Sequence, residues 1–207
     1  DGFPKNLLIE NDSGRAEVLL KGSAVENLSL ILRNGDIIKE LRDEVDAYEY
    51  DLTIIGGSAK RSMSHDMIQY INSSIFVVNN FNKTINYKIL LAVDDSPGTK
   101  KAVKYGVRVA QAFGIKVQII TVNEDENFNE ANKKASESAS KMMRRCGVKA
   151  ETKFEIGKPV DKIIELAGED HIIIMGASTQ SPIAKFFVGS KPLNVMQNSN
   201  CPILIVK

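Results

Sequence analysis

The sequence predicts an α/β fold in which parallel sheets are flanked by helices and one unit is written twice. Short apolar runs, apolar on both faces, alternate with stretches of helical periodicity, which is typical of parallel sheets. Landmarks in the first part of the chain recur in the same order in the second part. These two observations predict a first domain at residues 1–79, a polar linker at 80–86 and a second domain at 87–207.

The first domain is predicted to alternate strands and helices from its start. Its least regular helix is the one at 16–25, because Gly22 interrupts the apolar stripe. A helix that begins near Ile37 has a clearer stripe, and the strand after it ends at a glycine pair, Gly56-Gly57. The expected strands are 5–10, 28–33, 51–55 and 75–78, and the expected helices are 16–25, 37–45 and 63–72.

The second domain repeats the alternation with longer elements. Two of its helices are closed by glycine, at Gly114 and Gly147, the residue type that favours a helix C-terminus. The strand at 148–156 is mostly alternating, so its pattern is weaker than that of its neighbours. The expected strands are 87–93, 116–122, 148–156, 171–175 and 202–206, and the expected helices are 99–113, 124–146, 160–167 and 191–198.

Four pairs of landmarks relate the two domains. Because an internal repeat determines the fold of both domains, it carries more weight in the fold prediction than any single element. Between Gly56 and Ile75 the first domain is eight residues shorter than the second domain is between Gly176 and Ile203. The first domain is therefore predicted to be a trimmed copy. The paired landmarks are Asn11-Asp12-Ser13 with Asp94-Asp95-Ser96, Asn34-Gly35 with Ile156-Gly157, 51–56 with 171–176, and 75–78 with 203–206.

Charge is unevenly distributed along the chain. Residues 1–86 carry nine Lys and Arg against thirteen Asp and Glu, whereas residues 87–207 carry eighteen against thirteen. The basic second domain suits an anionic ligand, but its basic residues are too little clustered to predict a nucleic-acid partner. No apolar run approaches the ~20 residues that span a bilayer, so no membrane insertion is expected. Two cysteines without metal spacing, Cys146 and Cys201, predict a reduced, cytoplasmic setting.

The stretch from Gly176 to Ser190 is the candidate phosphate site. A strand that ends in glycine, with Gly189-Ser190 opening the next helix, lets the backbone approach a ligand and offers unpaired N–H groups. The alternative is a tight strand-to-helix connection in which Ser190 is an ordinary N-cap. No catalytic residue is predicted, because His65 and His171 are isolated and no triad or metal spacing occurs.

The sequence resembles the universal stress protein family, as a tandem of two units. The nucleotide-binding members have Gly, two residues, Gly, nine residues, then Gly-Ser or Gly-Thr, and here Gly176 and Gly189-Ser190 keep that spacing while Thr179 replaces the second glycine. The family-like segments Val93-Asp94-Asp95-Ser96 and 200–206 add to the resemblance. It implies two Rossmann-like units, of the adenine nucleotide alpha hydrolase-like type, packed face to face as an intrachain pseudo-dimer whose last strands pair antiparallel.

The resemblance also implies one adenine-nucleotide site per chain, in the second domain. ATP is the expected ligand, with AMP or ADP as alternatives and Mg²⁺ as a companion of ATP. The trimmed first domain lacks the loop and is expected not to bind. The implied contacts are Asp94 with ribose or adenine, Val122 with adenine, Met175 and Gly176 along the floor, and Gly176, Thr179, Gly189 and Ser190 around the phosphates.

Three functions remain open from the sequence. The first is an ATP-binding stress or signalling module with at most slow ATP hydrolysis, acting as a homodimer or as the intrachain pseudo-dimer. The second is an interaction module that ignores nucleotide, motivated by Thr179 and by the trimmed first domain. The third is an adenylating enzyme of the ATP-pyrophosphatase type, for which Asp94-Asp95-Ser96-Pro97 is a poor version of the glycine-serine loop.

Overall fold

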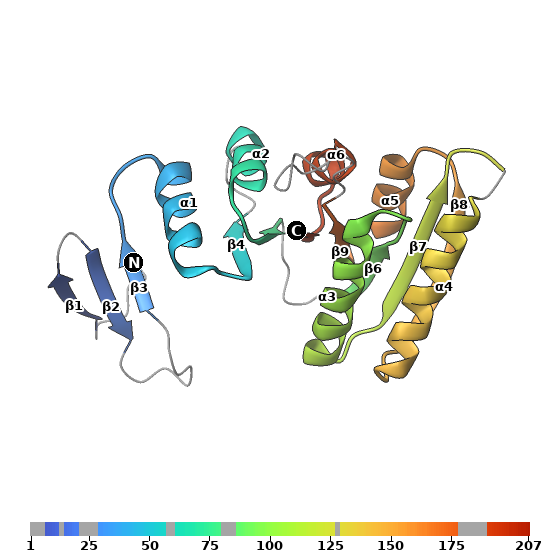
Figure 1. The fold of residues 1–207 in the computed structure, drawn as a ribbon, viewed down its shortest axis with the longest axis horizontal. Coiled ribbons are helices and arrows are strands. Elements are labelled where there is room, and N and C mark those ends of the chain that lie inside the picture. Colours follow the sequence, from blue (N-terminus) through green and yellow to red (C-terminus); the bar gives the residue numbers. More distant parts are fainter. Residues whose placement is uncertain are drawn as a thin grey trace.

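The computed structural model describes residues 7–12, 15–20, 29–56, 61–79, 86–126, 129–177 and 190–207. These residues form a three-stranded sheet and a seven-stranded sheet (Figure 1). The strands are β1 (Leu7–Asp12), β2 (Arg15–Leu20), β3 (Ser29–Leu32), β4 (Leu52–Gly56), β5 (Ser74–Val78), β6 (Lys88–Ala92), β7 (Val117–Asn123), β8 (Ala150–Ile156), β9 (His171–Gly176) and β10 (Ile203–Val206). The helices are α1 (Ile37–Tyr48), α2 (Arg61–Tyr70), α3 (Pro97–Phe113), α4 (Glu130–Arg145), α5 (Pro159–Ala167) and α6 (Ser190–Asn198).

The seven-stranded sheet has the order β4-β5-β10-β9-β6-β7-β8. All of its neighbours are parallel except β5 and β10, which pair antiparallel with Ile205 opposite Ile75 and Ile203 opposite Val77. The expected antiparallel pairing of the last strand of each half is therefore confirmed. The expected pair of sheets packed face to face is instead one mostly parallel sheet to which both halves contribute.

The start of the chain differs most from the sequence prediction. β1, β2 and β3 form an antiparallel sheet, with β2 between the other two. The predicted helix at 16–25 is wrong over residues 16–20, which lie in β2. A run of six residues is too short for periodicity to separate helix from strand, and pairing on both sides decides the outcome. Asn11 and Asp12 also lie in a hairpin strand, so this landmark does not match the Asp94-Asp95-Ser96 connection.

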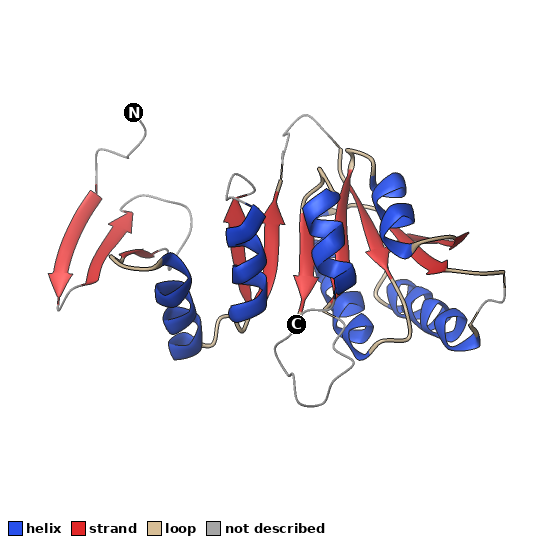
Figure 2. Ribbon diagram, turned by 90° about the horizontal axis from the view of Figure 1, so that it is seen from above, coloured by secondary structure: helices blue, strands red, loops and turns tan. Residues whose placement is uncertain are grey.

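Most other elements lie close to their predicted positions. The chief difference is α4, which begins at Glu130 and not at residue 124, because the Asn129 side chain caps it by accepting from the N–H of Ala131 at 2.9 Å. Figures 1 and 2 place the three-stranded sheet at one end of the long axis, with α4 and β8 at the other in Figure 1. The expected linker at 80–86 falls almost entirely outside the described residues.

Helices cover the seven-stranded sheet on both faces (Figure 2). Successive residues of a strand point to opposite faces, and the core divides accordingly. Leu90 of β6 belongs to the core cluster that includes residues of α1, α2, α5 and α6, whereas Ile89 and Leu91 belong to the cluster that includes residues of α3 and α4. All three side chains are fully buried. Apart from β8, whose residues are mostly exposed, the strands of the second half are thus apolar on both faces because both faces are covered.

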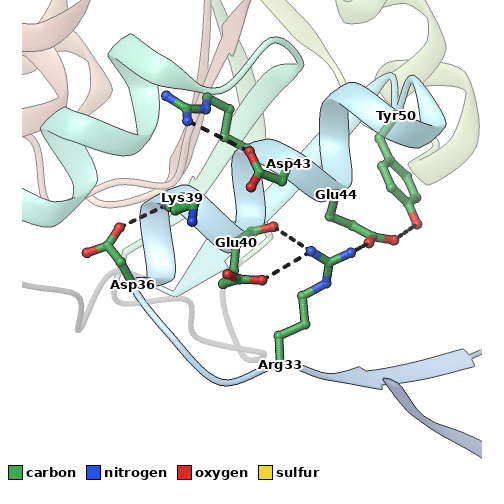
Figure 3. Close-up of polar contacts among 8 residues, drawn as sticks. Arg33, Asp36, Lys39, Glu40, Asp43, Glu44 and Tyr50 are labelled. Atoms are coloured by element: carbon green, nitrogen blue, oxygen red, sulfur yellow. Dashed lines mark hydrogen bonds and ion pairs between the residues drawn. The ribbon is translucent and has the colours of Figure 1, made fainter. Parts of the chain in front are cut away.

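A charged cluster fastens β3 to α1 (Figure 3). The Arg33 guanidinium, just after β3, donates to the Glu40 carboxylate at 3.2 Å and to the Glu44 carboxylate. Tyr50 donates its hydroxyl to the other oxygen of Glu44 at 3.1 Å. Because Glu44 is buried, its charge needs these partners. Asp36 caps the same helix by accepting from the N–H of Lys39 at 2.9 Å.

The residue after β10 links the two halves. The Lys207 ammonium donates to the carbonyl of Ile71, and the Lys207 N–H donates to the Ser74 hydroxyl at 3.3 Å. From α3, the Tyr105 hydroxyl donates to the carbonyl of Asp51 at 3.2 Å. Burial lowers the pKa of Lys207 to about 8, because the charged ammonium loses hydration there.

The stability difference between wild type and Lys207→Met should depend on pH. Burial disfavours the charged ammonium of Lys207. Below about pH 8 the folded state therefore bears the full desolvation penalty of that charge. The penalty disappears as pH rises from about 8 to the unfolded value of 10.5, and it amounts to at most roughly 3 kcal/mol. We expect the free energy of unfolding of Lys207→Met, relative to wild type, to fall over that interval in urea titrations. A difference that is independent of pH would contradict this reading of Lys207.

No helix in the described ranges is both long and apolar enough to cross a bilayer.

Candidate functional site

A small cavity lies where the strands of the second half end. Carboxyl ends of parallel strands and the loops that follow them are the usual ligand site in open α/β sheets. The cavity has a volume of about 100 Å³. Its lining residues come from β6 and the turn after it, from β7 and β9, and from α4, α5 and α6. They are Ala92, Val93, Asp94, Asp95, Ile120, Val122, Asn132, Pro159, Ile163, Met175, Gly176, Lys191 and Pro192.

Asp94 follows β6, and its carboxylate is held on one side only. Its Oδ1 accepts from the N–H of Ser96 at 3.1 Å and from the hydroxyl of Thr99 at 2.8 Å. Thr99 is buried in the first turn of α3, so it fixes the carboxylate to the helix start. Within the described residues, Oδ2 of Asp94 has no hydrogen-bond partner. A half-buried carboxylate in this state can accept a hydroxyl donor from a ligand.

Gly176, the last residue of β9, is in close contact with Gly98 of α3. A Cβ atom on Gly176 would lie 2.4 Å from the carbonyl carbon of Gly98, and one on Gly98 would lie 2.9 Å from the carbonyl oxygen of Ala177. Distances below 3.0 Å are not tolerated between a Cβ and backbone. Both residues must therefore be glycine if α3 is to start against the end of β9. This gives Gly176 a packing role that the sequence did not reveal.

A chain of polar groups fixes the wall beside Asp95. The N–H of Asp95 donates to the Asn132 side chain at 2.9 Å, and Asn132 donates in turn to the Asn123 side chain at 3.1 Å. The carbonyl of Asn123 accepts from the N–H of Gly157 at 2.8 Å. The loops after β6, β7 and β8 are thereby tied together, which sets the width of the cavity.

The seven residues singled out from the sequence occupy different positions relative to this cavity. Four of them, Asp94, Val122, Met175 and Gly176, line it. Ser190 is exposed at the first position of α6 and is not among the lining residues. Thr179 and Gly189 lie outside the described residues.

Sequence reasoning missed several lining residues, chiefly Asn132 and Ile163. Asn132 is one of many polar residues on α4 and had no distinguishing signal. Ile163 belongs to the apolar stripe of α5, where a core role was the natural interpretation. Both reach the cavity only through the packing of their helices against the sheet.

His171 and Cys201 of the second half do not line this cavity. His171 begins β9, at the opposite edge of the sheet, and its Nδ1 is 3.0 Å from the carbonyl of Ala167 and 2.7 Å from the Asp170 carboxylate. Cys201 is buried, and burial raises the pKa of its thiol. No group of three or more His, Cys, Asp or Glu residues able to hold a metal ion is found in the described ranges.

The second half, with its strand order β8-β7-β6-β9-β10 and its carboxyl-end cavity, matches a known protein family. The model of the universal stress protein family matches residues 86–207, which is more than half of the chain. The chain belongs to the universal stress protein family. The match begins two residues before β6, so it contains the whole cavity and does not include residues 1–85.

Individual universal stress proteins are similar over this region or over more of the chain. A relative from Methanocaldococcus jannaschii is 27% identical over 138 residues, covering 58% of this chain and 81% of the relative. A solved structure from Archaeoglobus fulgidus, 18% identical with a TM-score of 0.64, covers 84% of this chain, which spans 66% of that one. Another universal stress protein, solved in complex with cAMP, is 27% identical with a TM-score of 0.49 over 59% of this chain and 97% of that one.

Proposed function

We propose that the second half of this universal stress protein binds one adenine nucleotide in the carboxyl-end cavity and acts as a nucleotide-responsive regulatory module. The observation that carries the proposal is the Asp94 carboxylate, which is fixed through Oδ1 and has Oδ2 without a partner among the described residues. Ribose hydroxyls are donors of the kind that this oxygen accepts.

An apolar floor beside Asp94 suits the adenine ring. Val122 at the end of β7 and Met175 at the end of β9 face the same cavity from two strands, and Ile163 closes it from α5. Ligand sites combine apolar walls with a few polar groups that fix orientation. In this arrangement Asp94 orients the ribose and the apolar side chains contact the base.

The phosphates are assigned to the segment from Gly176 to the start of α6. The spacing of Gly176, Thr179 and Gly189-Ser190 follows the nucleotide-binding motif of the family. At the start of α6, Ser190 and Lys191 are exposed and supply a hydroxyl and a cation, while Pro192 has no N–H to donate. ATP, ADP and AMP share this chemistry, and an affinity that rises with each added phosphate would identify ATP.

A second candidate function is an interaction module that ignores nucleotide. The cavity volume of about 100 Å³ favours it, since ligand pockets usually measure roughly 300–1,000 Å³. An adenylating enzyme of the ATP-pyrophosphatase type has less support. In the turn after β6 the N–H of Ser96 is already engaged by Asp94 and that of Thr99 by the carbonyl of Ser96, whereas a phosphate loop needs free donors.

We also propose that the first half is a trimmed relative of the second and does not bind nucleotide. In both halves a strand is followed by a glycine with positive φ and then a helix, with φ of 145° at Gly35 and 137° at Gly157. The order β4-α2-β5 parallels β9-α6-β10, and α1 contacts α2 as α5 contacts α6. On this proposal domain 1–79 is a pairing partner that β5 attaches to the nucleotide-binding domain 87–207.

The test is calorimetric titration of the full chain with ATP, ADP and AMP, with and without Mg²⁺. We expect one site per chain for at least one nucleotide. Asp94→Ala should weaken binding roughly tenfold or more, because a hydrogen bond to a charged acceptor contributes roughly 1.5–3 kcal/mol.

Glu137→Ala, which removes one exposed carboxylate of α4, is the matched control and should leave the affinity unchanged. Gly189→Asp should abolish binding by placing a negative charge beside the phosphates. The absence of binding heat at millimolar ATP with Mg²⁺ would refute the proposal in favour of the interaction module.

A further inference from the structure

A row of basic residues crosses the seven-stranded sheet at the amino-terminal ends of its strands. His171 of β9 pairs in register with Lys88 of β6. Ile89 pairs with Val117, and Val117 pairs with Ala150. Lys88 of β6 therefore stands level with Lys116 and Lys149, the residues directly before β7 and β8.

Backbone hydrogen bonds support this register. The N–H of Ile89 donates to the carbonyl of Lys116, and the N–H of Val117 donates to the carbonyl of Lys149. In-register residues of parallel strands point to one face of a sheet, and neighbouring strands are about 4.8 Å apart. The three lysines therefore form a row of like charges, which we call the lysine row. Like charges directly opposite each other on neighbouring strands are destabilising.

Only one member of the lysine row is neutralised. Lys88 donates to the Asp170 carboxylate at 2.9 Å, and this contact lowers the pKa of Asp170, so the pair stays charged. Lys116 and Lys149 are exposed, and no ion pair or hydrogen bond engages either side chain within the described ranges. Two lysines in register without a counter-charge concentrate positive charge that a bound anion would neutralise.

The lysine row lines a cavity of about 750 Å³. Arg144 of α4 adds a further cation without a partner among the described residues, and Glu151 is the single carboxylate of the lining. Arg144 alone is explained by its place in the last turn of α4, where a cation complements the helix dipole. The lysines lie at or just before strand starts, where this explanation does not apply. Gln118 and Ser140 contribute neutral hydrogen-bonding groups to the same wall. The volume lies within the range of small-ligand sites.

We propose that this cavity at the amino-terminal ends of the strands binds a small multivalent phosphate compound. Lysine serves as a point-charge partner for phosphate, and cations on neighbouring strands suit a ligand that carries several phosphates in line. The site is distinct from the carboxyl-end cavity, because the whole length of β6 separates Lys88 from Asp94. That separation is roughly 20 Å at ~3.3 Å per residue.

Inorganic tripolyphosphate is the probe, and the full chain is titrated by calorimetry and by amide NMR at constant ionic strength. We expect saturable binding, with shifts at Val117 and Ala150 and not at Asp95 or Gly176. Lys116→Ala/Lys149→Ala should weaken binding roughly tenfold or more, because two charge-assisted contacts are lost. Lys104→Ala/Arg108→Ala, which removes two exposed cations of α3, should bind like wild type.

Thermal unfolding supplies a second readout. In buffer without multivalent anions, Lys116→Gln/Lys149→Gln should melt above wild type, because the repulsion along the lysine row is relieved. With saturating tripolyphosphate the order should reverse, because only wild type gains binding energy.

Three results would overturn the proposal. The first is equal affinity in wild type and Lys116→Ala/Lys149→Ala, which would place tripolyphosphate elsewhere. The second is stabilisation reproduced by sodium chloride at matched ionic strength, which would reduce the effect to screening. The third is tighter binding of a hexaglutamate peptide than of tripolyphosphate, which would make the cavity a docking site for acidic protein segments.

Discussion

Gly176→Ala should destabilise the protein by roughly 2–4 kcal/mol, because the new methyl group would overlap the backbone of α3. The Cβ would lie 2.4 Å from the carbonyl carbon of Gly98 and 2.7 Å from its oxygen. Backbone on both sides of the contact cannot move as a side chain can, so α3 would have to shift away from β9. The free energy of unfolding in urea measures the effect.

Gly106→Ala, in α3, is the matched control. Its Cβ would meet the terminal methyl of Met143 at 3.2 Å, and a flexible side chain can yield there. We expect a change within about 1 kcal/mol, because alanine also improves helix propensity. If Gly176→Ala proved as stable as Gly106→Ala, the contact between Gly98 and Gly176 would not be a packing requirement.

Ile75→Asp should cost at least about 4 kcal/mol, because it places an unpaired charge in the middle of the sheet. Ile75 is fully buried on β5, and it stands opposite Ile205 of β10, which is fully buried as well. The antiparallel junction should open first. Amide exchange should therefore lose protection in β4 and β5 while β6 and β7 keep theirs.

Ile54→Asp tests whether the loss of stability in Ile75→Asp comes from the buried position or from the change to aspartate itself. Ile54 lies one strand away on β4 and is 63% exposed. The same substitution there should change the free energy of unfolding by no more than about 1 kcal/mol, the span of β-propensity. Equal losses at both positions would mean that the junction is not a central part of the core.

The sequence predicted the second half well because most of its strands are apolar on both faces. Ile172 to Met175 and Ile203 to Val206 read as buried strands from composition alone, and both lie inside the sheet. Residues 15–20 could not be assigned in this way. Their apolar positions fit either period, and only pairing with β1 and β3 makes them a strand.

The candidate site was predictable where a motif marked it and unpredictable where only packing did. Asp94, Met175 and Gly176 follow strands and were found by spacing and resemblance. Gly98 looked like an ordinary turn glycine, because its contact with Gly176 exists only in three dimensions. The lysine row was invisible for the same reason, since its members are far apart in sequence and meet only through strand register.

The position of β10 has a consequence for how the protein is made. This strand is the last described element of the chain, yet it lies between β5 and β9 and pairs with both. During translation the β4–β5 pair and the β9 edge are complete before β10 leaves the ribosome. Until then the nascent chain has two open strand edges, a state prone to pairing with other chains. The synthesis of β10, and not the folding of either half alone, joins the sheet into one.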